Sequence, residues 1–150
     1  MKKFLLVSIL ALVSLSGCSI VKGLLTEPMT PHYTIAAEPV ECVRQGNNVR
    51  FSFIMLNKGS DLGNFRVQNS DGAMVTDNRG NSYTFDVAVG GNTRGHSPFP
   101  PGVPVRVDVT VFNVSSTAAA FSIVKLWGIS SVGNANSIRG HFTFRNIPIL

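Results

Sequence analysis

A run of alternating valines constrains the fold of this chain more than any other feature. Within residues 103–114, every second position at the start of the run holds a valine: Val103, Val105, Val107, Val109 and Val111. Side chains of an extended strand point alternately to opposite faces, so these valines share one face. The run therefore predicts a strand with one side on a hydrophobic core and the other side in solvent.

Two other segments, 49–57 and 138–146, alternate in the same way. Their apolar residues are Phe51, Phe53 and Met55 in the first segment and Phe142 and Phe144 in the second. In the second segment His141, Thr143 and Arg145 are predicted to face away from the core. Ile147 and Ile149 are out of phase with the two phenylalanines by one residue, which predicts a bulge or the end of the strand.

Weaker strand patterns and turn residues occupy most of the remaining sequence. The weaker strands are expected at 33–43, 64–68, 73–76, 82–89 and 119–127, with Gly- and Asn-containing turns at 46–48, 70–72 and 78–81. Fourteen Gly, eight Pro and 44% hydrophobic residues suit such a chain. We expect an all-β fold, a single antiparallel β-sandwich of about eight strands that is immunoglobulin-like and spans residues 32–150.

The first residues predict a signal peptide rather than part of the domain. Lys2 and Lys3 precede an apolar run over 4–13, which is too short to span a bilayer permanently. The run ends in Leu15-Ser16-Gly17-Cys18, which resembles the lipobox of bacterial lipoprotein precursors. Residues 1–17 are therefore predicted to be the signal peptide. The alternative is an ordinary cleaved signal peptide with an incidental cysteine.

The resemblance implies that Cys18 becomes the first mature residue and carries fatty acyl chains, including palmitate. Two or three chains on one cysteine would anchor the protein stably. Ser19 after the cysteine favours the outer membrane over the inner one, with the domain facing the periplasm. Residues 18–31 would form a tether, whose thirteen residues after the cysteine average roughly 20 Å in length if flexible.

The mature chain also resembles, loosely, small immunoglobulin-like domains of envelope lipoproteins of unknown function. The resemblance rests on the turn Asp77-Asn78-Arg79-Gly80-Asn81-Ser82-Tyr83 and on Pro100-Pro101-Gly102 before the valine strand. No functional residue follows from it.

Charge and cysteine usage limit the partners and the chemistry. Removal of Lys2 and Lys3 lowers the formal net charge from +5 to about +3 (5 − 2), and the arginines are scattered, so a nucleic-acid partner is not expected. With Cys18 lipidated, Cys42 has no intramolecular partner. We interpret Cys42 as a small buried hydrophobic residue, the alternative being a reactive thiol.

The segment 90–102 is the predicted binding loop, with Arg94, His96 and Phe99 as its candidate contact residues. If the strands run alternately up and down, the turns at 46–48 and 69–72 share one end of the sandwich with 90–102 and 130–137. That end would face away from the membrane. The alternative for both long segments is a solvated crossover between sheets.

No catalytic or metal-binding pattern emerges from the sequence. His32, His96 and His141 lack metal-ligand spacing, and Gly128–Val132 lacks the second glycine of a serine-hydrolase elbow. Glu38 and Glu41 are three residues apart and would face opposite sides of a strand, while Asp86 and Asp108 are isolated. No cofactor is expected.

These observations predict a membrane-anchored, non-catalytic binding or structural module that faces the periplasm and binds an envelope protein or another envelope partner. The alternative is an inhibitor of, or a small enzyme acting on, envelope components through the 90–102 loop. A structural subunit that pairs its 147–150 edge with a neighbouring strand is a third hypothesis.

Overall fold

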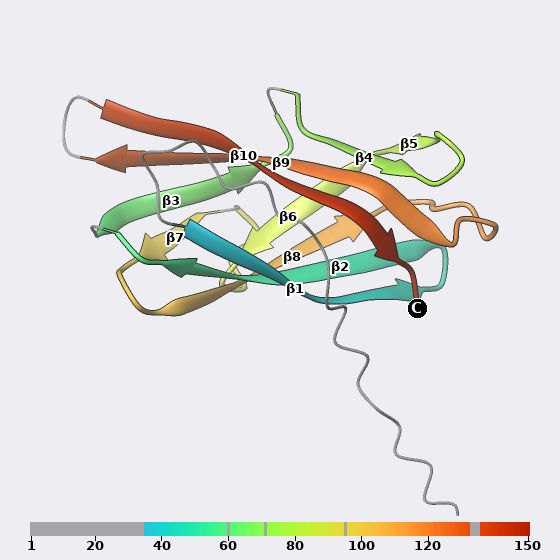
Figure 1. Cartoon of the computed structure of the whole chain (residues 1–150), viewed down its shortest axis with the longest axis horizontal. Helices are drawn as coiled ribbons and strands as arrows, with labels where there is room; N and C mark the ends of the chain where they lie inside the picture. The colour runs from blue at the N-terminus through green and yellow to red at the C-terminus, as the bar shows by residue number, and fades with distance from the viewer. Residues whose placement is uncertain (1–34, 60, 71, 95, 133–135) are drawn as a thin grey trace, which may run out of the picture.

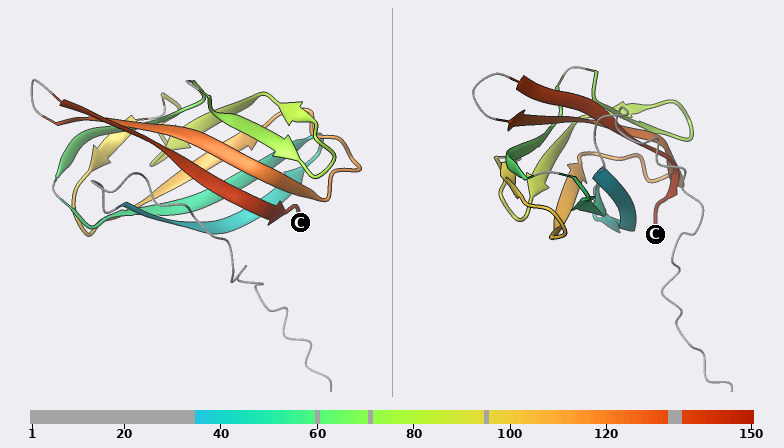
Figure 2. Two further views of the ribbon diagram at one scale, coloured as in Figure 1. Left: turned by 45° about the horizontal axis from the view of Figure 1, so that its top comes forward. Right: turned by 60° about the vertical axis from the view of Figure 1, so that its left-hand side comes forward.

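The fold is an antiparallel β-sandwich, as the sequence predicts. The computed structural model describes residues 35–150 except 60, 71, 95 and 133–135 (Figure 1). These residues form strands and turns, with two sheets packed face to face (Figure 2). Within this part of the chain there is no helix that could cross a membrane.

Sheet 1 has four strands, and its spatial order is β1-β2-β8-β6. Their bounds are β1 Ile35–Gln45, β2 Asn48–Asn57, β8 Pro104–Val111 and β6 Phe85–Val89. Sheet 2 has six strands: β3 Leu62–Gln68, β4 Met74–Asp77, β5 Ser82–Tyr83, β7 His96–Phe99, β9 Ala120–Val132 and β10 Asn136–Pro148.

Sheet 2 is organised around β9, which pairs along both edges. β10 follows one edge of β9 from Val132 to Ala120. β3 and β4 therefore lie end to end along the other edge, and β7 and β5 pair with them on the outside. If β3 and β4 are counted as one interrupted strand and the short strands β5 and β7 are left out, then β1, β2, β6 and β8 are the first, second, fourth and fifth strands of the chain. These four strands share one sheet, as in immunoglobulin-like sandwiches.

The alternating residues supply the core, with one exception. Val105, Val107, Val109 and Val111 of β8 are buried, but Val103 is 48% exposed because it precedes the strand. Phe51 and Phe53 of β2 are fully buried against Phe144 of β10, with ring centroids 5.0 and 4.8 Å from it. Aromatic side chains of opposite sheets therefore interlock at the centre of the sandwich.

The predicted change of phase in β10 is observed, but neither the predicted bulge nor an earlier strand end accompanies it, because the register with β9 does not shift and β10 continues to Pro148. Phe144 and Ile147 are both buried although they are three residues apart. Asn146 between them has a positive φ of 54°, which turns the strand so that Ile147 regains the core.

The two ends of the sandwich differ from the prediction. At the N-terminal end, β1 begins at Ile35, which pairs with Asn57, and Asn57 donates from Nδ2 to the carbonyl of Phe99 at 2.9 Å. The end of β9 and the start of β10 lie at this same end (Figure 1, left). The turn at 46–48 follows the far end of β1, so it lies at the opposite end of the sandwich, here called the C-terminal end. There the amide of Val114, which follows β8, donates to the carbonyl of Asn47.

The predicted common end for 46–48, 69–72, 90–102 and 130–137 is therefore wrong. The prediction assumed that successive strands run in opposite directions. This assumption fails because β3 and β4 run in the same direction and because an additional strand, β7, lies inside the predicted 90–102 loop. The break between β3 and β4 falls partway along β9 and at neither end of the sandwich.

The last residues of the chain do not form an unpaired edge. Ile147 pairs with Phe121 of β9. The amide of Leu150 donates to the carbonyl of Cys42, and its carbonyl accepts from the amide of Arg44, both at 2.9 Å. Because this segment joins the two sheets, the hypothesis that residues 147–150 are an open edge for a neighbouring strand is contradicted.

A buried carboxylate organises the β4–β5 hairpin at the C-terminal end. Asp77 is 1% exposed and accepts hydrogen bonds from the amides of Arg79 and Asn81, from Asn81 Nδ2, and from the hydroxyl of Tyr83 at 2.6 Å. Burial alone would raise the pKa of Asp77, but these hydrogen bonds outweigh it and lower the pKa to about 2.

We expect Asp77 to make the domain sensitive to acid. The folded-state pKa lies below the ordinary value of 3.8, so the stabilisation is present above about pH 4 and is lost as pH falls towards 2. A shift of this size contributes up to about 2 kcal/mol. Denaturant unfolding between pH 7 and pH 2 should show this loss for the native chain but not for Asp77→Asn. The same loss in Asp77→Asn would contradict the assignment, and Asp61→Asn, at an exposed loop position, is the control.

Candidate functional site

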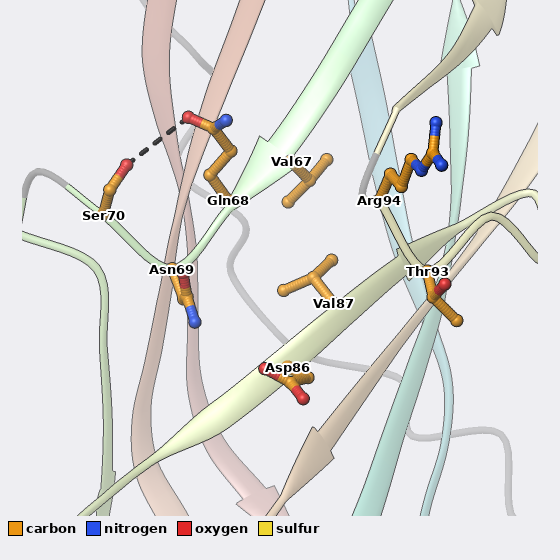
Figure 3. Close-up of a pocket in the computed structure, with 8 residues that line it drawn as sticks. All are labelled: Val67, Gln68, Asn69, Ser70, Asp86, Val87, Thr93 and Arg94. Carbon is orange, nitrogen blue, oxygen red and sulfur yellow. Dashed lines mark hydrogen bonds between the residues drawn. The ribbon is translucent and has the colours of Figure 1, made fainter.

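A pocket of about 440 Å³ opens on the side of the sandwich where β6 of sheet 1 approaches β3 of sheet 2 (Figure 3). It is lined by Val67, Gln68, Asn69, Ser70, Asp86, Val87, Thr93 and Arg94. The lining thus comes from the end of β3, the segment after it, β6, and the segment between β6 and β7. Residues from three separate stretches of the sequence meet here.

The pocket has an apolar floor and a polar rim. Val67 and Val87 are 1% and 8% exposed and point towards each other from the two sheets (Figure 3). Gln68, Asn69 and Ser70 stand on one side of the floor, and Thr93 and Arg94 stand on the other. Such a mixture of an apolar base and a few convergent polar groups is typical of small-ligand sites.

The interruption of the strand after β3 forms one wall. The ladder with β9 ends at Gln68 of β3 and resumes at Met74 of β4, and Asn69 and Ser70 lie outside it. Asn69 then uses Nδ2 to donate to the carbonyl of Phe85 at 2.9 Å, which ties this wall to sheet 1. Ser70 contacts Gln68 Oε1 through its hydroxyl at 3.4 Å, a long bond that a ligand can replace.

A two-glycine turn forms the opposite wall. The amide of Val89 donates to the carbonyl of Asn92, and the amide of Asn92 donates back to the carbonyl of Val89. Gly90 and Gly91 between them have φ values of 55° and 78°, which a type I′ turn requires. Asn92 Oδ1 accepts from the amide of Arg94 at 2.9 Å, so the turn sets the position of the next residues.

The charged groups of the rim define what the pocket can bind. Arg94 is exposed, and its side chain makes no hydrogen bond or ion pair with any described residue. Asp86 is exposed on the β6 side. A guanidinium, a carboxylate, hydroxyls and amides around one apolar floor fit a small polar ligand that carries a carboxylate together with hydrogen-bond donors.

The structure separates the three predicted contact residues. Arg94 lines the pocket. His96 begins β7 opposite Arg66, and its side chain lies outside the described part. The prediction that Phe99 is a surface contact residue is wrong, because Phe99 is 1% exposed and packs on Phe65 with ring centroids 5.1 Å apart. Pairing of β7 with β3 draws this ring into the core.

Cys42 and His141 do not line the pocket. Cys42 is buried, as expected, and burial raises the pKa of its thiol to about 12, despite an opposing effect of Arg44. The ring of His141 is tilted by 58° against that of Trp127, with ring centroids 4.5 Å apart. Cys18 and His32 fall outside the described residues, and no cluster that could hold a metal is found among those described.

Acidic residues that are isolated in the sequence meet on the outer face of sheet 1. Glu41 Oε1 accepts from Arg50 at 3.0 Å and from Arg106 at 2.5 Å. Asp108 accepts from Arg106 Nε at 3.0 Å and from the buried Ser52 hydroxyl at 2.6 Å. The hydrogen bonds to Asp108 and then Glu41 raise the pKa of Arg106.

The prediction that Glu38 and Glu41 face opposite sides is also wrong. The register of β1 shifts between Pro39 and Glu41, which pairs Glu38 with Ile54 and Glu41 with Ser52. A bulge at this point puts both carboxylates on the outer face.

Sequence reasoning missed most of the pocket. Asn69 and Ser70 were read only as turn residues and Asp86 as an isolated acid, yet all three line the site. The turn residues after a short strand were the available signal. No protein-family model matches the chain, and no curated protein matches it significantly.

We expect the Gly90-Gly91 turn to control the shape of the pocket. Gly91 has open space around its Cα, so Gly91→Val tests backbone strain alone. A β-branched residue at this positive φ should lower the free energy of unfolding by roughly 1–2 kcal/mol. Gly91→Asn should cost less, since Asn tolerates this conformation. Urea unfolding measures both, and equal losses would contradict the assigned turn.

Proposed function

We propose that this chain is a lipid-anchored protein of the bacterial envelope whose β-sandwich faces the periplasm and binds a small polar ligand or partner group without catalysis. Anchoring is supported by the signal-like start and by the lipobox ending at Cys18. Binding is supported chiefly by one observation, the pocket between the sheets with Arg94 on its rim.

The construction of the pocket favours recognition. Its two walls are fixed by hydrogen bonds at Asn69 and Asn92, so the backbone that carries the rim groups is held in place before a ligand arrives. A wall that is already ordered loses little freedom on binding, which raises affinity. The floor of Val67 and Val87 adds apolar contact.

The two groups whose pKa values are shifted furthest, Cys42 and Asp77, lie in the core and in a hairpin and not in the pocket. Cys42 is a core thiol with a pKa of about 12, so it carries no thiolate at neutral pH. Asp77 is fully engaged by its hairpin. Neither group lines the pocket.

The alternative is an inhibitor of envelope enzymes, or a small enzyme, that acts through the 90–102 segment. Asp86 is the observation in its favour, because it places a carboxylate at the pocket opposite residues of that segment. Catalysis would make Asp86 essential for turnover of an envelope substrate, whereas in a binding site Asp86→Asn changes affinity alone.

Cys18 is expected to be essential for membrane residence. In cells that express the native chain, metabolic labelling with palmitate should mark the protein, and the protein should fractionate with membranes. Cys18→Ser should lose the label and leave the membrane fraction, because no acyl chains remain to bury. Cys42→Ser is the matched control and should keep both properties. A membrane-bound, normally processed Cys18→Ser protein would contradict the anchor.

Arg94 is expected to dominate recognition at the pocket. N-acetylmuramyl dipeptide, which carries a carboxylate, amides and hydroxyls, is a suitable soluble probe. In amide NMR spectra it should shift the signals of residues 67–70, 86–87 and 93–94. Arg94→Ala should weaken binding roughly tenfold or more, through the loss of a charge-assisted hydrogen bond of about 1.5–3 kcal/mol. Arg79→Ala, at an exposed turn position, should bind normally. Shifts confined to other surfaces would contradict this site.

A further inference from the structure

The two outer faces of the sandwich differ in charge. Sheet 1 carries the acidic residues Glu38, Glu41, Asp86 and Asp108 together with arginines that pair with some of them. The strands of sheet 2 contain a single acid, Asp77, and that residue is buried in its hairpin. The charges that sheet 2 presents to solvent are therefore cationic.

Strand alternation places these cations around one tryptophan. Leu126 of β9 and Phe142 of β10 are buried, so Lys125, Trp127 and His141 occupy the outer face. The contact between the tilted rings of Trp127 and His141 agrees with this placement. Arg66 and Arg145 are exposed on the neighbouring strands β3 and β10.

Apolar side chains complete the same face. Met74 of β4 is 42% exposed and pairs in register with Lys125. Ile129 of β9, opposite Arg66, is partly exposed. A partly exposed tryptophan with aliphatic neighbours and flanking Lys and Arg is the composition that proteins place at the boundary between lipid and water.

We infer that the outer face of sheet 2 docks on the anionic phospholipid surface of the membrane that carries the protein. The inference rests on the proposed anchor, because acyl chains on Cys18 would hold the domain beside the bilayer at an effective concentration on the order of millimolar. At that concentration a weak electrostatic contact is populated. Charge complementarity and the interfacial tryptophan favour phospholipid over a soluble polyanion.

Docking in this way would leave the pocket accessible. The pocket opens where β6 approaches β3, on the side of the sandwich away from β1 and β10. The outer face of sheet 2 can therefore contact lipid while the pocket side remains in the periplasm.

Trp127 is the single tryptophan of the chain, so its fluorescence reports on this face directly. The lipidated native protein should be reconstituted into vesicles of phosphatidylcholine alone or with phosphatidylglycerol. With phosphatidylglycerol, Trp127 emission should move to shorter wavelength and become quenched by brominated lipid. Both effects should disappear in about 0.5 M salt, where the Debye length falls to a few ångströms.

Variants on and off the face then test the assignment. The double variant Arg66→Gln with Lys125→Gln should lower the docking equilibrium constant roughly twentyfold, or about fivefold per cation. Lys58→Gln with Arg79→Gln removes the same charge at exposed positions outside the face and should dock normally. Equal docking of the two double variants, or equal emission in both kinds of vesicle, would overturn the inference.

Two outcomes separate this inference from the anchor itself. If the native protein floats with neither kind of vesicle, the proposed lipid anchor is wrong, and the inference that depends on it is overturned as well. Flotation with both vesicles but no response of Trp127 would leave the anchor intact and overturn the docking face. A Trp127 response to soluble heparin and not to phosphatidylglycerol vesicles would also overturn it, in favour of a polyanionic glycan.

Discussion

The pairing of β9 along both of its edges is the constraint on which the rest of this structure depends. β10 occupies one edge for the whole length of β9, so β3 and β4 must share the other. Two short strands cannot cover a long one without a break between them, and Asn69 and Ser70, which follow β3 at this break, form part of one wall of the pocket. The hollow beside Val67 and Val87 is thus a consequence of sheet geometry.

The two sheets are held together differently at the centre and at the C-terminal end. At the centre, apolar burial dominates, with phenylalanines of β2 and β10 interlocked. At the C-terminal end, polar groups take over. The guanidinium of Arg44 donates to the carbonyls of Val114, Ser115 and Ala118, and the backbone of Leu150 bonds to β1. The Arg44 bonds satisfy the carbonyls of Val114 and Ala118 in the crossover from β8 to β9, while the carbonyl of Ser115 also accepts from the amide of Ala118.

Local sequence patterns predict the positions of the strands well, but they predict poorly which residues lie at the surface. The alternating valines of β8, the phenylalanines of β2 and the phase change at Asn146 were all predicted from a few neighbouring residues, because burial on one face imposes a period of two. Phe99 was misplaced for the opposite reason. Its position follows from the pairing of β7 with β3, two segments far apart in the sequence, and a local window contains no record of that contact.

By itself, the sequence determined the all-β class, most strand positions and the turns at Gly46, Gly72 and Gly80, since each follows from side-chain alternation or from the need for positive φ. The stretch Leu15–Cys18, on which the proposed anchor rests, is likewise a linear signal. Tertiary structure alone decided which ends meet, the pocket around Arg94 and Asp86, and the contrast in charge between the two faces. Those features depend on strand order and on the bulge in β1 before Glu41, and both are set by packing across the whole domain.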